Sequence, residues 1–382
     1  DMHKVFIDGQ AGTTGLLIRA RLDQRKDIDL VDINDSERKD ESIKQEIIKS
    51  SDVVILCLPD DAAKRSVELA EDAPVKFIDA STAHRVDPSW DFGLPELAKE
   101  QRHQIQNSKR VSNPGCWSTA FLLAMRPLID AQLLSPKSDF TAHGVSGYSG
   151  GGRTMIEDYE ERATTHPNNL WYSRPYSLQL QHKHLPEMQL HAGLARKPMF
   201  MPSVGHFHQG MLVNIPVTEQ AMDRIDSLEQ VHLTLEDRYK DEPCVTVHKP
   251  NTDDSLEKGF LDPQGANHTN RIDLFVYGNS HQMLLIARLD NLGKGASGAA
   301  VQNLNLMLGV DEPAGGGVST RGAVFGMIAL GADVPEPVVG VTVAGVSVVG
   351  DSVGTVGSGL DELGFEEPGE DVSGALVGTV GA

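Results

Sequence analysis

The stretch that most constrains the fold is a short apolar strand that runs into a glycine-rich turn and then into a helix. The strand is expected at residues 5–8 and the helix at residues 16–22. Glycines in such a turn let the backbone approach a pyrophosphate, whose charge the helix N-terminus favours. The spacing is G-x-x-G-x-x-G rather than G-x-G-x-x-G, but the strand and helix on either side are the context that a dinucleotide site requires. The alternative is a turn that binds no ligand. The candidate cofactor residues are Gly9, Gly12, Thr13, Thr14 and Gly15.

The end of the second expected strand, residues 28–33, carries conflicting signals about the cofactor. Asp32 and Asp35 would bind a ribose 2′-hydroxyl and favour NAD. Ser36 and Arg38, just beyond them, would bind a 2′-phosphate and favour NADP. The residues alone leave both cofactors open.

Three further apolar segments, residues 53–58, 76–81 and 110–113, predict the other strands of a parallel sheet. Ligands of such sheets lie beyond the carboxyl ends of the strands. Ser81 and Arg85 stand at such an end and are placed to bind a small anion. Cys57, inside an apolar strand, is interpreted as a core residue.

An Asn-Pro-Gly turn delivers Cys116 to the start of a long apolar helix, expected over residues 117–134. Unpaired N–H groups and the helix dipole favour a thiolate over a thiol there, so we expect a lowered pKa. Such a cysteine is a candidate nucleophile. Taken alone, the cysteine favours a structural interpretation over a catalytic one, because free cysteines are among the most buried residues.

His182 and His184 lie two residues apart and are followed by Glu187. This group suggests either acid–base catalysis or metal binding. A zinc site needs three or four ligands in fixed geometry. Cys116 with both histidines is conceivable as such a site, but we assign no metal.

The second half of the chain reads as a different domain. Strands with few helices between them predict an α+β unit with a mainly antiparallel sheet. His206 and His208 would alternate along one strand and share a face, without an assigned role. The expected elements are a loop at 143–153, a helix at 155–162, strands at 200–217, 231–235, 244–248 and 272–289 (a hairpin around Gly278), and a glycine-rich loop at 290–300 before a helix at 299–308.

Composition narrows the function classes. A chain of 382 residues is long enough for two full cores, and a net charge of −20 argues against nucleic acid or an anionic membrane as partner. Three cysteines show no disulfide framework, which favours a reducing compartment, here the cytoplasm. We expect no transmembrane helix and no targeting peptide. Residues 311–382, rich in Gly and Val, read as a low-complexity tail, disordered or loosely attached.

Taken together, the motifs resemble the shorter type of N-acetyl-gamma-glutamyl-phosphate reductase, within the aspartate-semialdehyde-dehydrogenase-like group. The resemblance spans roughly residues 2–309 and departs from the family at Trp117, where tyrosine is usual. The matching segments, in the family's order, are Gly9–Gly15, Asp79–Arg85, Gly93–Glu96, Asn113–Cys116, His182–Glu187 and Asp290–Ala300.

The resemblance implies an α/β chain with an N-terminal Rossmann-like domain (residues 1–113 and about 291–310) and an α+β, mainly antiparallel catalytic and oligomerisation domain (residues 114–290). It implies NADPH-dependent reduction of an acyl phosphate through a cysteine thioester, in a homo-oligomer, a dimer or tetramer. It favours NADP, with Ser36 and Arg38 at the 2′-phosphate. The implied site residues are Cys116 as nucleophile, His184 (or His182) as acid–base, Glu187 orienting a histidine, Ser81, Arg85 and Ser149 at the substrate, and Asn291 near the nicotinamide.

Two other functions stay open at this stage. A reductase of the same group could act on an aspartyl or aminoadipyl phosphate, because pocket contacts decide the substrate. A non-catalytic NADP-binding sensor would carry the dinucleotide turn without a paired nucleophile and base.

Overall fold

A computed structural model describes residues 2–34, 36–38 and 40–314. Asp35 and most of the tail expected at residues 311–382 lie outside the described residues.

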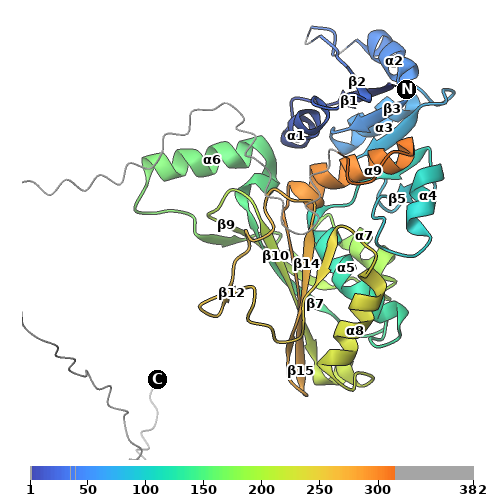
Figure 1. Cartoon of the computed structure of the whole chain (residues 1–382). Helices are drawn as coiled ribbons and strands as arrows, with labels where there is room; N and C mark the ends of the chain where they lie inside the picture. The colour runs from blue at the N-terminus through green and yellow to red at the C-terminus, as the bar shows by residue number, and fades with distance from the viewer. Residues whose placement is uncertain (1, 35, 39, 315–382) are drawn as a thin grey trace, which may run out of the picture. The chain divides into compact units, whose positions relative to one another are not determined.

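The N-terminal third forms a parallel sheet with helices on both faces (Figure 1). Its described strands run in the order β2-β1-β3-β4-β6-β5. Val5 of β1 packs with Leu304 of α9 on one face, whereas Phe6 packs with Ile48 of α2 on the other. The elements are β1 (His3–Asp8), α1 (Thr13–Leu22), β2 (Ile28–Val31), α2 (Glu41–Ser50), β3 (Val53–Leu56), α3 (Asp60–Glu68), β4 (Lys76–Asp79), β5 (Asp91–Phe92), α4 (Gln101–Asn107), β6 (Arg110–Ser112) and α9 (Gly298–Leu308).

The rest of the described chain forms a second, larger sheet in the order β11-β14-β15-β10-β7-β9-β8. Most of its pairs are antiparallel; β7–β9 and β11–β14 are parallel. The elements are α5 (Cys116–Asp130), β7 (Thr141–Gly147), α6 (Gly152–Thr165), β8 (Ser173–Pro175), α7 (Leu185–Ala192), β9 (Met199–Gly205), β10 (Met211–Thr218), α8 (Leu228–Tyr239), β11 (Val245–Val247), β14 (Ile272–Gly278) and β15 (Gln282–Leu289), with a small hairpin of β12 (Leu256–Glu257) and β13 (Phe260–Leu261).

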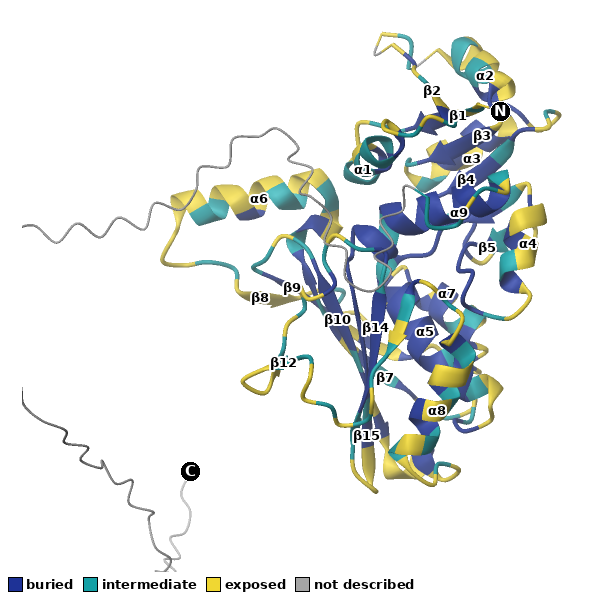
Figure 2. Ribbon diagram, in the orientation of Figure 1, coloured by how far each residue is buried: buried dark blue, intermediate teal, exposed yellow. Residues whose placement is uncertain are grey.

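Helix α5 packs on the second sheet and supplies much of its core. Its residues Phe121 and Met125 are fully buried against sheet residues such as Val213 and Leu285. Figure 2 shows α5 and the central strands as one buried mass, whereas α6 is mostly exposed. The predicted architecture, a Rossmann-like sheet followed by a mainly antiparallel one, is confirmed.

Three local predictions are wrong. Residues 231–235 belong to helix α8, which Ser227 caps by accepting a hydrogen bond from the Gln230 N–H. The expected loop at 143–153 begins as strand β7. His206 and His208 do not share a strand, because β9 ends at Gly205.

Candidate active site

The glycine turn between β1 and α1 has the shape that the sequence predicted. Gly9 has φ of +92°, and a Cβ there would lie 2.3 Å from the carbonyl oxygen of Cys57. A Cβ at Gly15 would lie 2.6 Å from the carbonyl oxygen of Gly9. Gly12, the N-cap of α1, brings no side chain to its first N–H groups. The turn therefore fits a pyrophosphate at the helix N-terminus.

A pocket of about 380 Å³ connects this turn to the ends of β3 and β4. Cys57 packs against the core of the parallel sheet, as expected, and it also lines this pocket. Lys183 and Arg153 also line it and bring positive charge that the sequence interpretation left out. The lining residues are Gly12–Gly15, Cys57–Asp60, Ala80–Thr82, Arg85, Gly152, Arg153 and Lys183.

Cys116 is the first residue of α5, as predicted. A Cβ at Gly295 would lie 2.7 Å from the Cβ of Cys116, so the returning chain packs directly on the cysteine. The expected lowering of the thiol pKa is wrong for this structure. Burial raises the pKa of Cys116 to about 11, against the opposing effects of Arg85 and the Trp117 N–H. Desolvation of a thiolate outweighs the helix terminus here.

Gly115, just before the cysteine, is where the catalytic candidates meet. A Cβ at this position would lie 2.4 Å from Cε1 of His184 and 2.6 Å from Nη1 of Arg85. Glycine is therefore the only residue that lets both side chains pack against the start of α5.

Glu187 does not have the predicted role of orienting a histidine. One of its carboxylate oxygens accepts a hydrogen bond from Nη1 of Arg85 at 2.7 Å, and the other accepts from the Gly115 N–H at 3.2 Å. Arg85 also donates to the carbonyl oxygens of Asn113 and Ala80. The buried pair thus fixes Arg85 beside the pocket and ties α7 to the turn before α5.

The two histidines differ in what holds their rings. Nδ1 of His182 accepts a hydrogen bond from the His184 N–H at 3.1 Å, and its Nε2 lies 3.3 Å from the Tyr176 hydroxyl. Among the described residues, no hydrogen bond engages either ring nitrogen of His184, and its Nδ1 is buried. Burial lowers the pKa of His182 to about 4 and holds that of His184 well below its usual value. Both rings are therefore neutral at neutral pH.

The other predicted substrate and nicotinamide residues fall into two groups. Ser81 lines the pocket, but its hydroxyl donates to Asp79 at 2.8 Å. Ser149 and Asn291 are buried outside the pocket lining and bond to each other at 3.0 Å. Asn291 also accepts from the Gly210 N–H at 2.7 Å.

The predicted 2′-phosphate residues lie after β2. Ser36 is exposed and Arg38 half-buried, and neither lines the pocket. Asp32, the rival signal for NAD, forms an ion pair with Arg19, which lowers the pKa of its carboxyl group. Arg19 also donates to Gln10 of the glycine turn at 2.8 Å. The pairing neutralises the charge that would repel a 2′-phosphate.

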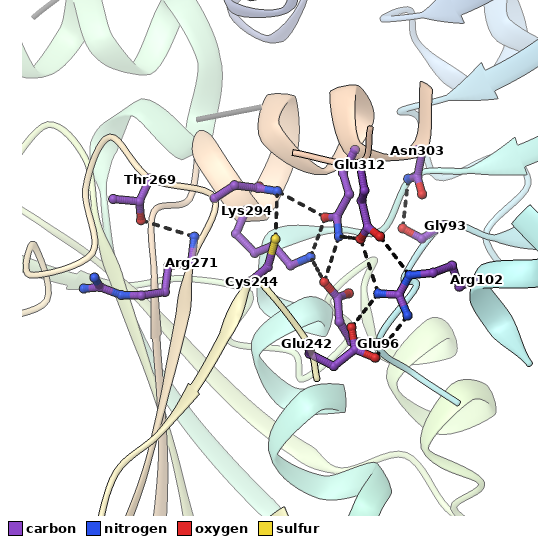
Figure 3. A network of polar contacts seen from close by, with 12 residues as sticks. Gly93, Glu96, Arg102, Glu242, Cys244, Thr269, Arg271, Lys294, Asn303 and Glu312 are labelled. Atoms are coloured by element: carbon purple, nitrogen blue, oxygen red, sulfur yellow. Dashed lines mark hydrogen bonds and ion pairs between the residues drawn. The ribbon is translucent and has the colours of Figure 1, made fainter. Parts of the chain in front are cut away.

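A second buried cluster, here called the Lys294 network, joins Lys294, Glu96, Gln302, Glu312 and Arg102 through hydrogen bonds and ion pairs (Figure 3). Lys294 is fully buried in a π-helical turn (Gly293–Ser297), and its ammonium group donates to Glu96 and Gln302, both at 2.7 Å. Gln302 extends the network to Glu312, which pairs with Arg102. The network fixes the position of the Gly293–Ser297 turn, in which Gly295 packs against Cys116.

Two classes of feature are not found in the part of the chain that the structure describes. No group of three His, Cys, Asp or Glu residues there could hold a metal ion. No helix there is long and apolar enough to cross a membrane.

Two family models match the chain. The model described as "Semialdehyde dehydrogenase, NAD binding domain" matches residues 23–105, and "Semialdehyde dehydrogenase, dimerisation domain" matches residues 116–291. The solved aspartate semialdehyde dehydrogenase II of Vibrio cholerae superposes with a TM-score of 0.63 at 17% identity, covering 81% of this chain and 98% of that one. The aspartate semialdehyde dehydrogenase of Candida albicans, solved with NADP, has a TM-score of 0.57 at 13% identity, covering 81% and 99%. These likenesses concern the fold.

Curated proteins found by sequence have much higher identity to this chain than the solved structures do. N-acetyl-gamma-glutamyl-phosphate reductase 2 of a Nostoc species is 47% identical over 82% of this chain and 98% of its own length. The N-acetyl-gamma-glutamyl-phosphate reductase of a Chelativorans species is 46% identical over 80% of this chain and 98% of its own. The chain therefore belongs to the N-acetyl-gamma-glutamyl-phosphate reductase family.

Proposed function

We propose that this protein reduces N-acetyl-gamma-glutamyl phosphate to N-acetylglutamate 5-semialdehyde with NADPH and releases phosphate, a step of arginine biosynthesis. The observation that carries the proposal is the meeting of His184 and Arg85 at Gly115, beside Cys116. A nucleophile, a base and a cation thus converge at the start of α5. The cation, Arg85, also lines the pocket that reaches the dinucleotide turn. A dinucleotide-binding sensor would have no need of this convergence.

Cys116 is the nucleophile in this proposal. Because burial raises its pKa to about 11, the thiol is protonated at rest and needs a base as it attacks. The sulfur bonds to the acyl carbon, the bond to phosphate breaks, and the departing phosphate takes a proton from water. NADPH, bound at the glycine turn, supplies the hydride that reduces the resulting thioester.

His184 is the acid–base residue. It takes the thiol proton during attack and returns it to the oxygen of the reduced thioester, which then collapses to aldehyde and thiol. The hydrogen bonds support His184 over His182, because both nitrogens of a neutral His182 are engaged. His184 keeps a ring free of hydrogen bonds beside the cysteine.

The phosphate of the substrate binds at the end of β4. Ser81 and Arg85 stand there, and Lys183 and Arg153 add positive charge along the same pocket. Because Glu187 neutralises Arg85, the net attraction for a phosphate comes mainly from Lys183 and Arg153. Ser149 supports the substrate side through Asn291.

The cofactor lies along α1. Gly12, Thr13, Thr14 and Gly15 bind its pyrophosphate, and Gly9 permits the tight turn. Ser36 and Arg38 bind the 2′-phosphate, next to an Asp32 that Arg19 has neutralised. Asn291 holds the nicotinamide side of the site.

Three coarser features complete the proposal. Residues 1–113 with about 291–310 form the cofactor domain, and residues 114–290 the catalytic domain. The dimerisation-domain match to residues 116–291 supports a homo-oligomer, which we take to be a dimer or tetramer. The enzyme acts in the cytoplasm.

The decisive experiment replaces Cys116 with Ser. We expect the variant to lose NADPH oxidation with the acyl phosphate while its NADPH affinity, measured by fluorescence titration, stays within about twofold of wild type. Near-normal turnover would contradict the covalent mechanism. The reverse reaction of the wild type with NADP, phosphate and either N-acetylglutamate, aspartate or aminoadipate semialdehyde identifies the substrate. A preference for one of the latter two would overturn the assignment.

Cofactor choice is tested at Arg38. Arg38→Ala is expected to lower the preference for NADPH over NADH about tenfold, because a charge-assisted hydrogen bond to the 2′-phosphate is lost. The control is Lys26→Ala, which removes an exposed positive charge just before the edge strand β2. An unchanged preference in Arg38→Ala would remove this residue from the cofactor site.

A further inference from the structure

Tyr176 reaches the start of α5 from the irregular segment after β8. Its hydroxyl oxygen accepts a hydrogen bond from Nε1 of Trp117, the residue after the cysteine, at 2.9 Å. The large indole fits because Gly144 lies beneath it; a Cβ there would be 2.2 Å from Cζ3 of Trp117. Phe200 packs edge-on against the same indole, with ring centres 5.3 Å apart. Trp117 is therefore held as a fixed donor to Tyr176.

His182 supplies a second donor to the same oxygen. Because the His184 N–H donates to Nδ1 of His182, that nitrogen carries no proton. The ring is neutral at neutral pH, since burial lowers its pKa to about 4. Its one proton is therefore on Nε2, which lies 3.3 Å from the Tyr176 oxygen and donates to it.

These two donors determine what the hydroxyl itself can do. The Tyr176 oxygen accepts from Trp117 on one side and from His182 on the other, which uses both of its lone pairs. Its own proton is committed to neither partner and is left for a third group. The hydroxyl lies at the start of α5, because its donor Trp117 directly follows Cys116 in the chain. Its other partner, His182, packs with its ring centre 4.7 Å from that of His184, which lies against Gly115 just before the cysteine. Cys116 is therefore the group nearest in the chain to receive this proton, and the charge of its sulfur also raises the pKa of Tyr176.

We infer that the Tyr176 hydroxyl donates a hydrogen bond to the Cys116 sulfur when it is a thiolate, and so is a further catalytic residue of the proposed reaction. A buried thiolate lacks the water that would otherwise stabilise it, and a preorganised donor replaces that water. Tyr176 keeps its proton throughout, because burial and the neighbouring sulfur both raise its pKa. His182 acts as a positioning residue for this hydroxyl, distinct from the proton transfer by His184.

The test is Tyr176→Phe, which keeps the ring and removes only the hydroxyl. We measure the alkylation rate of Cys116 by iodoacetamide against pH, following the Cys116 peptide by mass spectrometry so that Cys57 and Cys244 do not contribute. The apparent pKa of the thiol is expected to rise by about one unit, and kcat to fall about 10- to 100-fold with little change in KM. Tyr172→Phe, just before β8 and 70% exposed, is the matched control and is expected to change neither.

Trp117→Phe provides a second variant, because it removes one of the two donors that direct the hydroxyl. We expect a shift of the same sign and smaller size. An alkylation profile identical to wild type in Tyr176→Phe would overturn the inference. The alkylation needs neither substrate nor cofactor. A wild type that alkylates as expected but fails to reduce the acyl phosphate would refute the proposed function and leave only the hydrogen bond from Tyr176 to the Cys116 thiolate standing.

Discussion

Two buried ion pairs lie near Cys116, and the side chains beside them differ in how they are hydrogen-bonded. Arg85 and Glu187 form one at 2.7 Å, and Lys294 and Glu96 form the other at the same distance. In the Lys294 network, amide and carboxylate side chains continue the pair outward to Arg102. Beside Arg85, the neighbouring His184 ring has no hydrogen bond from the described residues.

This difference in hydrogen bonding distinguishes the Lys294 network, which stabilises the fold, from His184, whose ring stays available for proton transfer. A buried charge with its partner in place is tolerated, and losing the partner is costly. A buried ring without a partner contributes little through hydrogen bonding, so removing it costs little stability. We therefore expect substitutions in the Lys294 network to affect stability and substitutions at His184 to affect catalysis.

The largest effect is expected for His184→Asn. Loss of the acid–base group should lower kcat/KM about 10²- to 10⁴-fold, as is typical for general acid–base catalysis. The midpoint of urea denaturation should stay close to wild type, because no hydrogen bond to the ring is broken. A variant that loses stability but keeps its turnover would reverse the comparison.

The second-largest effect is expected for Lys294→Met, which leaves the buried Glu96 carboxylate without its positively charged partner. The free energy of unfolding should fall by about 3–5 kcal/mol, measured by urea denaturation. The loss should lessen as the pH falls, because an unpaired buried carboxyl group takes up a proton.

Arg196→Met is the control for this variant. Arg196 and Asp139 form an exposed pair at 2.7 Å, with 59% and 82% of their side chains exposed. Breaking it should cost about 0–1 kcal/mol. Equal losses in the two variants would show that burial of the Lys294 pair is not what matters.

The smallest effect is the response of the folded protein to acid. The pKa values of His182 and His184 are lowered by folding, so the unfolded chain binds more protons below pH 6.5. Stability is therefore fully present above that pH and falls as the pH drops, by about 1–2 kcal/mol for His182 between about pH 6.5 and pH 5 and in the same direction for His184. His182→Asn with His184→Asn should flatten this decline in urea denaturation series. An unchanged slope would place the acid sensitivity elsewhere.

Local patterns carried the predictions that the structure confirms. The glycine turn, the hairpin around Gly278 and the position of Cys116 at a helix start depend on residues that are neighbours in the sequence. Residues 231–235 were mistaken for a strand because their β-branched and apolar types fit both structures, and only the Ser227 cap distinguishes the helix.

Contacts between distant segments could not be predicted in the same way. Tyr176 lies 59 residues from Trp117 in the chain, on a segment without periodicity. Lys294 and Glu96 pair across 198 residues. The thiol pKa was mispredicted for a related reason: the helix terminus is visible in the sequence, whereas the packing that desolvates the sulfur is not.

The contact between Gly295 and Cys116 has a mechanical consequence. The chain leaves the parallel sheet at Cys116 and comes back to it through the turn that holds Gly295, so both crossings meet at the nucleophile. Any rotation of one sheet against the other must change the packing on the cysteine Cβ. A rotation about these two crossings would therefore displace the nucleophile less than any group farther from them.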